Sequence, residues 1–232
     1  MDYTNLKTLI EEERDEELLV LQKDVLAVID KDITTHQHWQ QKAEKSHHKV
    51  DRTARELLSD LHKCQRLPLK ATADGNCLFN NSCSILLIGT EKLARDLRVA
   101  VSIELFLQRE FYRCHPSLTK KIDEDLTLKI DKLNNTIVKK ECHDKEGDII
   151  VKEAILNLKN HTWSSLMSMF ALVSVVKRDI VSVYPGDLST FKPKLYNGTI
   201  YPINGKSDEF SFGEIYIFLF VFHIVNNRYY IF

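Results

Sequence analysis

One cysteine in this chain stands where a nucleophile would be activated. The residues Asp74-Gly75-Asn76 favour a tight turn, and Cys77 follows them directly. The apolar stretch Leu78 to Ile88, which ends at Gly89, predicts a helix that begins at this cysteine. Unpaired backbone N–H groups and the helix dipole at such a helix start stabilise a thiolate, which is the reactive form of cysteine.

The same turn offers groups for acyl transfer. Backbone N–H groups at the start of a helix can hold the oxyanion of a tetrahedral intermediate. Gly75 permits a positive φ, and Asp74 or Asn76 can donate or accept a hydrogen bond across the turn. We therefore assign Gly75, Asn76 and Leu78 to substrate binding and the oxyanion hole. The structural alternative is that Cys77 is a small buried hydrophobic residue, a common role for cysteine.

A thiol nucleophile also needs a base, normally a histidine that the fold brings to it. His223 follows the apolar run Ile215 to Phe222 and falls on a predicted C-terminal strand. The other histidines fall on polar helices, at helix ends or in loops, where solvation or capping accounts for them. For His223 too there is a structural alternative, a neutral histidine buried among the apolar residues of its strand.

The amino-acid composition argues against several classes of function. The chain has 232 residues, a formal net charge of −1 and 44% hydrophobic residues, as in an ordinary globular protein. The absence of a basic excess argues against a dedicated nucleic-acid partner, and the longest apolar run is too short to span a membrane. The five cysteines are an odd number without close pairs, which indicates free thiols in the cytoplasm, with the nucleus as the alternative. No cofactor and no metal site is expected.

Two domains are expected, with the boundary near residue 65. Residues 1–62 look helical and predict a hairpin, with one helix over about 6–29 and a second over about 33–62. The first 20 residues hold 7 acids and 2 bases, and residues 42–66 hold 7 bases and 4 acids, so the two helices would present opposite charges. This extension, residues 1–65, is either an element for self-association or docking, or a helical cap on the second domain, residues 66–232.

The second domain is predicted to be α+β, a small, mostly antiparallel sheet covered by helices. An amphipathic helix is expected from Thr90 to about Cys114, and a short one from Ile149 to Leu158. The segment Leu166 to Val176 is apolar nearly all round, which indicates a buried helix. Strands are expected over Asp179–Tyr184 and as one continuous run over Ile215–Val225.

The motif Asp74-Gly75-Asn76-Cys77-Leu78-Phe79 resembles the signature of the OTU (ovarian tumour) family of cysteine proteases, most of which are deubiquitinases. The helices around Trp163 and Ala171–Val176, followed by the strand Ile180–Tyr184, are similar to a second block of that family. The ending His223-Ile224-Val225 is comparable to that of vertnin-type OTU domains. The similarity covers about residues 66–226.

The resemblance implies an OTU-like cysteine protease fold and a thiol protease or isopeptidase that removes ubiquitin or a ubiquitin-like modifier. In it, Cys77 is the nucleophile, His223 the general base, and Asp74 shapes the oxyanion region. The chain departs from the family pattern after the histidine, where Ile224 replaces an aromatic residue and Val225 replaces the Asn or Asp that orients the imidazole. The alternative function is therefore a catalytically degenerate OTU-fold module that binds a protein partner.

Overall fold

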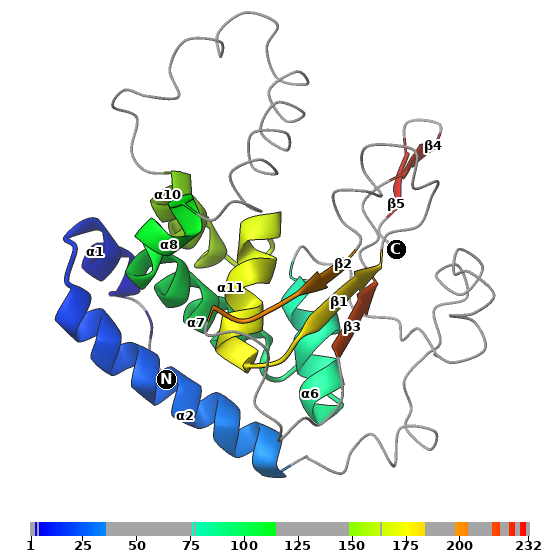
Figure 1. Ribbon diagram of the computed structural model, residues 1–232, viewed down its shortest axis with the longest axis horizontal. Coiled ribbons are helices and arrows are strands. Elements are labelled where there is room, and N and C mark those ends of the chain that lie inside the picture. Colours follow the sequence, from blue (N-terminus) through cyan, green and yellow to red (C-terminus); the bar gives the residue numbers. More distant parts are fainter. Residues whose placement is uncertain are drawn as a thin grey trace, which may run out of the picture.

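The helix α7 (Ala94–Leu107) forms the centre of the molecule. It packs against α2, α10, α11 and η2, which surround it in Figure 1. Nine consecutive or near-consecutive residues of α7 are buried, including one arginine, Arg98. The computed structural model describes residues 3, 5–35, 76, 78–114, 149–162, 164–183, 198–203, 215–218, 223–225 and 228–230.

The amphipathic stretch expected to run from Thr90 to Cys114 is two helices rather than one. The helix α7 ends at Leu107, and α8 covers Arg109–Cys114. Between them, Gln108 leaves the helical conformation at φ −103° and ψ 24°, while its N–H still donates to the carbonyl of Glu104. The hydrophobic period continues across this residue, which is why the break is invisible in the sequence pattern.

The N-terminal stretch also contains a turn that its periodicity does not reveal. The helix α1 covers Leu6–Glu11 and α2 covers Asp15–Thr35. Glu13 adopts a left-handed conformation (φ 52°), and the Arg14 N–H donates to the carbonyl of Leu9 at 2.9 Å. This is a Schellman ending in which glutamate occupies the usual glycine position.

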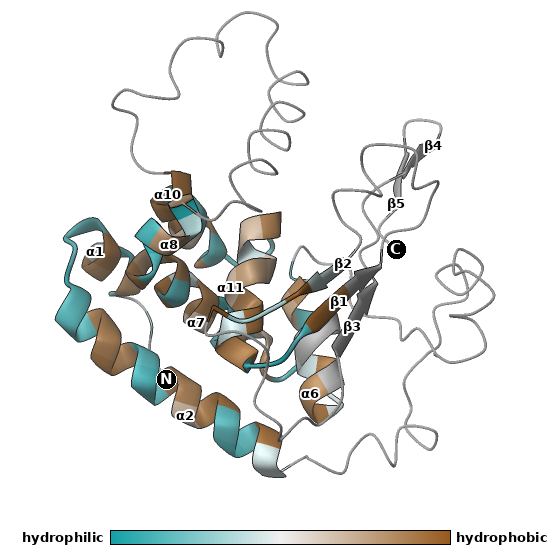
Figure 2. Ribbon diagram, viewed as in Figure 1, coloured by the Kyte–Doolittle hydropathy of each residue, from teal (hydrophilic) through white to brown (hydrophobic). Residues whose placement is uncertain are grey.

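The helix α2 runs unbroken through residues 30–35, so the predicted junction between two helices near residue 30 is wrong. Its buried residues Leu18, Val25 and Ile29 belong to the same hydrophobic core as α7. Alternating teal and brown bands along α2 in Figure 2 mark this amphipathic pattern. The rest of the predicted hairpin and the boundary near residue 65 lie outside the described residues.

The segment after Cys77 is helical, as predicted, but it is not an ordinary α-helix. The π-helix η2 covers Leu78–Ile85, and a final turn, α6, covers Leu86–Ile88. A π-helix has wider turns than an α-helix, and it is found frequently at functional sites. Gly89 ends the segment at φ 76°, which confirms the predicted glycine cap.

Two helices agree closely with their predictions. The helix α10 covers Ile149–Asn157, and α11 covers Leu166–Val176. Nine residues of α11 are buried, because α11 is packed against α7 and α10. The interior position of α11 explains why it is apolar on nearly all sides.

The strands form a small sheet and a separate hairpin. In the three-stranded sheet, β1 (Ile180–Val183) pairs antiparallel with β2 (Gly198–Ile200) and parallel with β3 (Ile215–Phe218). The strands β4 (His223–Val225) and β5 (Arg228–Tyr230) pair antiparallel with each other. The described residues are thus α+β, with helices in the majority.

The single strand predicted over Ile215–Val225 is wrong. Its two ends belong to different sheets, β3 beside β1 and β4 beside β5, and the hairpin lies apart from the three-stranded sheet in Figure 1. The parallel pairing of β1 with β3 was also not expected in a mostly antiparallel sheet. Strand pairing joins segments that are distant in the chain, so the alternation of apolar and polar residues within one segment does not predict it.

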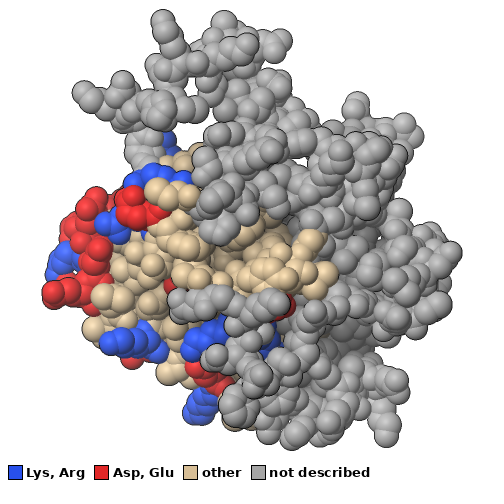
Figure 3. Space-filling model, in the orientation of Figure 1, with Lys and Arg blue, Asp and Glu red and all other residues tan. Residues whose placement is uncertain are grey.

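Charged side chains gather at one end of the described surface. Figure 3 shows acidic and basic residues side by side over α1 and the start of α2. Several of their ion pairs are local, as between Lys7 and Glu11 at 3.2 Å, and exposed pairs of this kind contribute little to stability. Asp15 at the start of α2 instead pairs with the distant Arg109 of α8 at 3.7 Å. A helix suited to crossing a membrane is absent from the described ranges, where the 21-residue α2 carries many charged side chains.

Candidate cysteine turn

The residues on either side of Cys77 define the start of η2. The carbonyl of Asn76 accepts hydrogen bonds from the N–H groups of Phe79 (2.9 Å) and Asn80 (2.8 Å). Leu78 is the first residue of the helix, and its side chain is buried. Cys77 itself lies outside the described residues; in the chain it stands between the carbonyl that begins the helix and the first helical residue.

Only one of the other residues predicted for this turn is described. Asp74 and Gly75 lie outside the described residues. Asn76 is described, and its side chain reaches beyond the turn. Its Oδ1 accepts the backbone N–H of His161 at 3.1 Å, a contact between residues 85 positions apart in the chain. This Asn76 oxygen therefore holds a distant loop, a contact that the sequence did not lead us to expect.

The helix η2 is anchored firmly behind the cysteine turn. Phe79 is fully buried in the core. Ser84 is buried as well, and its hydroxyl accepts the Leu93 N–H at 2.8 Å and donates to the carbonyl of Thr90 at 2.5 Å. These contacts join η2 to the beginning of the central helix α7.

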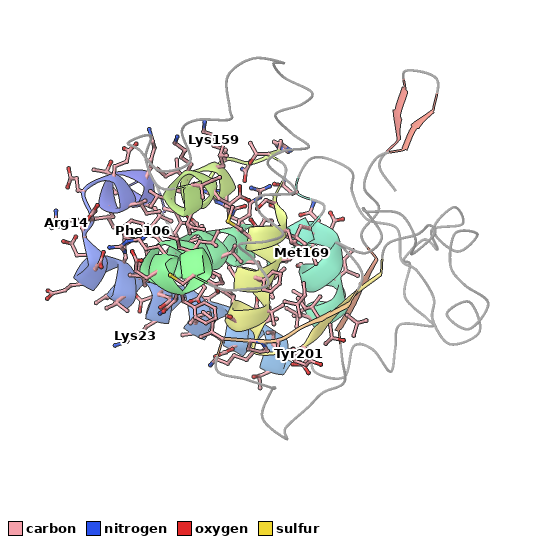
Figure 4. All side chains as sticks on the ribbon, turned by 45° about the horizontal axis from the view of Figure 1, so that its top comes forward. Arg14, Lys23, Phe106, Lys159, Met169 and Tyr201 are labelled. Atoms are coloured by element: carbon pink, nitrogen blue, oxygen red, sulfur yellow. The ribbon has the colours of Figure 1, made fainter. Side chains whose placement is uncertain are left out.

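The loop that reaches Asn76 follows α10 and covers residues 158–162. His161 has a left-handed backbone conformation (φ 61°) and an exposed side chain. Such a conformation is costly for a residue other than glycine and persists only when the surroundings impose it. In Figure 4, Lys159 of this loop projects from the surface, whereas Phe106 and Met169 lie in the interior between the helices.

Arg98 holds backbone carbonyls on both sides of His161. Its side chain is 1% exposed, and its Nη1 lies 3.0 Å from the carbonyl oxygen of Asn157 and 2.9 Å from that of Lys159. Its Nη2 donates to the carbonyl of Thr162, and the guanidinium carbon lies 4.9 Å from the centre of the Phe79 ring. Arg98 therefore contacts both the loop and η2.

A second polar network fixes the start of α11, directly after Trp163, which lies outside the described residues. The buried carboxylate of Glu153 accepts the Ser165 N–H at 2.8 Å and the Ser168 hydroxyl at 2.7 Å. Asn157 Nδ2 donates to the Ser168 oxygen at 2.8 Å. A carboxylate at a helix N-terminus is favourable because the helix dipole is positive there.

A third buried network links α2, α7 and α8. Gln22 donates to the carboxylate of Glu104 at 2.8 Å, and the Tyr112 hydroxyl donates to the same carboxylate at 3.2 Å. Burial raises the pKa of Glu104 above its ordinary value, although these two hydrogen bonds oppose the shift. Burial likewise raises the pKa of Tyr112, and the neighbouring Glu104 charge adds to the increase.

The predicted base is not brought beside the cysteine turn by any described contact. The backbone of His223 pairs with Tyr230 in the hairpin of β4 and β5, and its side chain lies outside what the structure describes. The three-stranded sheet, by contrast, reaches η2 through β3. The roles of Cys77 and His223 remain predictions from the sequence.

The sequence did not identify Arg98 and His161 as residues that support the start of η2. His161 contributes a backbone N–H, which every residue except proline possesses, so its residue type carries no signal. Arg98 does leave a trace, since it is a charged residue within the apolar stretch Leu97–Ile103 of α7. A charged residue in such a stretch is rarely buried unless it is well hydrogen-bonded.

Comparison with known proteins adds independent information. Residues 68–218, well over half of the chain, match the family model described as "Vertnin, OTU domain". Vertnin of Danio rerio is 27% identical over 130 residues, which are 51% of this chain and 17% of that protein. The chain thus spans only a small part of the length of that relative, and the matched region includes the cysteine turn, η2, α7 and the three-stranded sheet.

Proposed function

Because the chain belongs to the vertnin OTU-domain family, we propose that it is an OTU-like thiol isopeptidase that releases ubiquitin or a ubiquitin-like modifier from proteins. The observation that carries this proposal is the capping of η2 by the Asn76 carbonyl, immediately before Cys77. A cysteine at the first position of a helix has a reason for a lowered pKa and for nearby oxyanion donors. The proposed setting is the reducing environment of the cytoplasm.

In the proposed reaction, the Cys77 sulfur attacks the carbonyl carbon at the C-terminus of the modifier. His223 takes the thiol proton and returns it to the departing lysine amine as the carbon–nitrogen bond breaks. Water then attacks the resulting thioester, with the imidazole again accepting a proton, and the free modifier carboxylate and the thiol are released. No redox partner is needed, because every step is an acyl transfer.

The test is reaction of the full chain with a ubiquitin probe that carries a C-terminal electrophile. Parent protein should form a covalent adduct, and Cys77→Ala should form none. Cys114→Ser is the matched control, since Cys114 is an exposed free thiol on α8 whose loss should leave the adduct yield unchanged. Adduct formation by Cys77→Ala, or loss of the adduct in Cys114→Ser, would contradict the assignment of the nucleophile.

A second candidate function is a non-catalytic OTU-fold module that binds ubiquitin or another protein. It is favoured by the placement of His223 in a hairpin separate from the three-stranded sheet, and by Val225 two residues later, where a polar residue would orient the imidazole. This candidate predicts that Cys77→Ala binds ubiquitin as tightly as the parent does, in titration calorimetry, while the parent cleaves no ubiquitin chain. Cleavage by the parent protein would exclude it.

A further inference from the structure

We propose that Arg98 is a positioning residue for Cys77, and that it acts through the loop of residues 158–162 and through Phe79. This inference rests on the proposed function only in naming Cys77 as the nucleophile. Asn76 directly precedes Cys77, and Phe79 follows Leu78 in the first turn of η2. Both are held by the assembly that Arg98 organises, one through the loop and one directly.

The direct contact is between Arg98 and Phe79. The guanidinium carbon of Arg98 lies 4.9 Å from the centre of the Phe79 ring, and both side chains are buried. A guanidinium over an aromatic face is attracted by the negative face of the ring, and the attraction is stronger away from water. Phe79 is two residues after Cys77, so this contact fixes the rotation of the first turn of η2.

The indirect contact passes through the loop. Arg98 donates to the main-chain carbonyls of Asn157, Lys159 and Thr162, which lie on both sides of His161. The planar guanidinium presents five N–H donors in a fixed geometry, which allows one side chain to hold several carbonyls at once. With both flanks held, the His161 N–H is aimed at Asn76 Oδ1, 3.1 Å away.

The strained backbone of His161 supports this interpretation. A left-handed histidine is maintained only where neighbouring contacts outweigh its cost. The described contacts beside His161 include three hydrogen bonds from Arg98 to backbone carbonyls, together with hydrogen bonds made by Arg95 and by the Thr162 hydroxyl. A substitution that removes the planar guanidinium would allow residues 158–162 to relax. The N–H of His161 would then turn away from Asn76, and the residue directly before Cys77 would lose this support.

A neighbouring arginine provides the matched control. Arg95 lies one turn earlier on α7 and also donates to this region, with its Nη1 2.8 Å from the carbonyl of Leu158. It is exposed, however, and its guanidinium lies over Tyr3 rather than over η2. The Arg95 Nη1 also lies 3.4 Å from Oδ1 of Asn160, so Arg95→Lys disturbs the exposed side of the same loop and leaves Phe79 and the carbonyls held by Arg98 untouched.

The experiment compares parent protein, Arg98→Lys, Arg95→Lys and Asn76→Ala as full chains. Two readouts are followed: the rate constant for adduct formation with the ubiquitin electrophile, and the pH profile of Cys77 alkylation by iodoacetamide, read by mass spectrometry. The adduct yield reports the folded fraction, while the rate constant and the alkylation midpoint report how the thiol is placed. A purely structural role of Arg98 would lower the yield and leave the other two unchanged.

We expect Arg98→Lys to slow adduct formation by roughly 10- to 100-fold at saturating probe, the loss typical of a reacting group displaced by about 1 Å. The alkylation midpoint of Cys77 should move to higher pH, and Arg95→Lys should resemble the parent in both readouts. Asn76→Ala, which removes the acceptor on the other side of the loop, should reproduce the effect even if Arg98→Lys folds poorly. Combining Arg98→Lys with Asn76→Ala should slow the reaction by less than the product of the two single effects, because both changes act in part through one loop.

Unchanged rate constants and midpoints in Arg98→Lys and Asn76→Ala would overturn the proposal, as would equal effects of Arg95→Lys and Arg98→Lys. The proposed function is judged separately. If the parent fails to react with the ubiquitin electrophile but the alkylation midpoint still moves in Arg98→Lys and not in Arg95→Lys, the positioning role stands and the isopeptidase function fails. If the parent reacts and Arg98→Lys reacts equally fast, the isopeptidase function stands and the positioning role of Arg98 fails.

Discussion

Replacing Leu18 by alanine is expected to destabilise the whole described core, although Leu18 lies in the N-terminal extension. Leu18 is fully buried on the face of α2 that packs against α7, together with Val25 and Ile29. Its neighbour Leu19 is 44% exposed on an adjacent, solvent-facing side of the same helix. Because the two substitutions are chemically identical and one position apart, they differ only in whether the side chain belongs to the shared core.

The expected magnitudes follow from this difference in burial. Removal of a fully buried leucine side chain costs about 3–5 kcal/mol of unfolding free energy, since it combines lost burial with an internal cavity. An exposed substitution such as Leu19→Ala stays within about 0.5 kcal/mol. For a chain of this length, about 2–4 °C of melting temperature correspond to 1 kcal/mol. Leu18→Ala should therefore melt roughly 6–20 °C below Leu19→Ala.

The assays are thermal melting, which gives the temperature shift, and urea unfolding, both on the full chain and both followed by far-ultraviolet circular dichroism and by tryptophan fluorescence. The expected result for both variants is coincident transitions from the two probes, with the midpoint lowered only in Leu18→Ala. Equal midpoints for the two variants would refute the inclusion of α2 in the core. A separate early transition that alone responds to Leu18→Ala would show that the N-terminal helices unfold independently, as a distinct unit would.

Three further outcomes are expected. The pKa of Glu104 is raised in the folded state, so the parent protein loses stability as the pH rises through that pKa. Glu104→Gln removes this titration, and its unfolding free energy should therefore exceed that of the parent by more at pH 8 than at pH 5. Urea titrations of both proteins at the two pH values measure this difference. At neutral pH, Cys77 should be alkylated faster than the exposed Cys114 in a competitive mass-spectrometric experiment, whereas faster labelling of Cys114 would argue against an activated thiol. Ser165→Ala should cost about 0.5–2 kcal/mol of unfolding free energy, because its hydroxyl caps α11 by accepting the Met167 N–H at 3.1 Å, while Ser165→Thr retains most of the cap in the same assay.

Local patterns in the sequence are enough to identify several elements. The continuous apolar character of Leu166–Val176 predicts a buried helix, and the structure has α11 over exactly that range. The β-branched run after it predicts β1, and Gly89 predicts the end of the segment that follows Cys77. The motif Asp74–Phe79 also points to the OTU family, to which the chain belongs. Each of these signals depends on neighbours within a few turns of the chain, so no knowledge of distant contacts is required.

Breaks within continuous patterns are harder to predict. The interruption of α7 and α8 at Gln108, the Schellman turn at Glu13 and the wide turns of η2 all leave the hydrophobic period intact. Each depends on a small backbone rotation whose cost is offset by hydrogen bonds and packing elsewhere. A pattern that records only which side chains are apolar cannot register that balance.

Only the tertiary structure decides which distant residues meet. The apolar run near the C-terminus is divided between β3 and β4 because its first part finds a parallel partner in β1, and its second part pairs with β5. The cysteine turn is likewise supported by Arg98 and by the backbone of His161, from segments that are remote in the chain. The physical reason is that a backbone N–H has no residue identity, and the burial of an arginine depends on carbonyls that a loop 60 residues away brings to it.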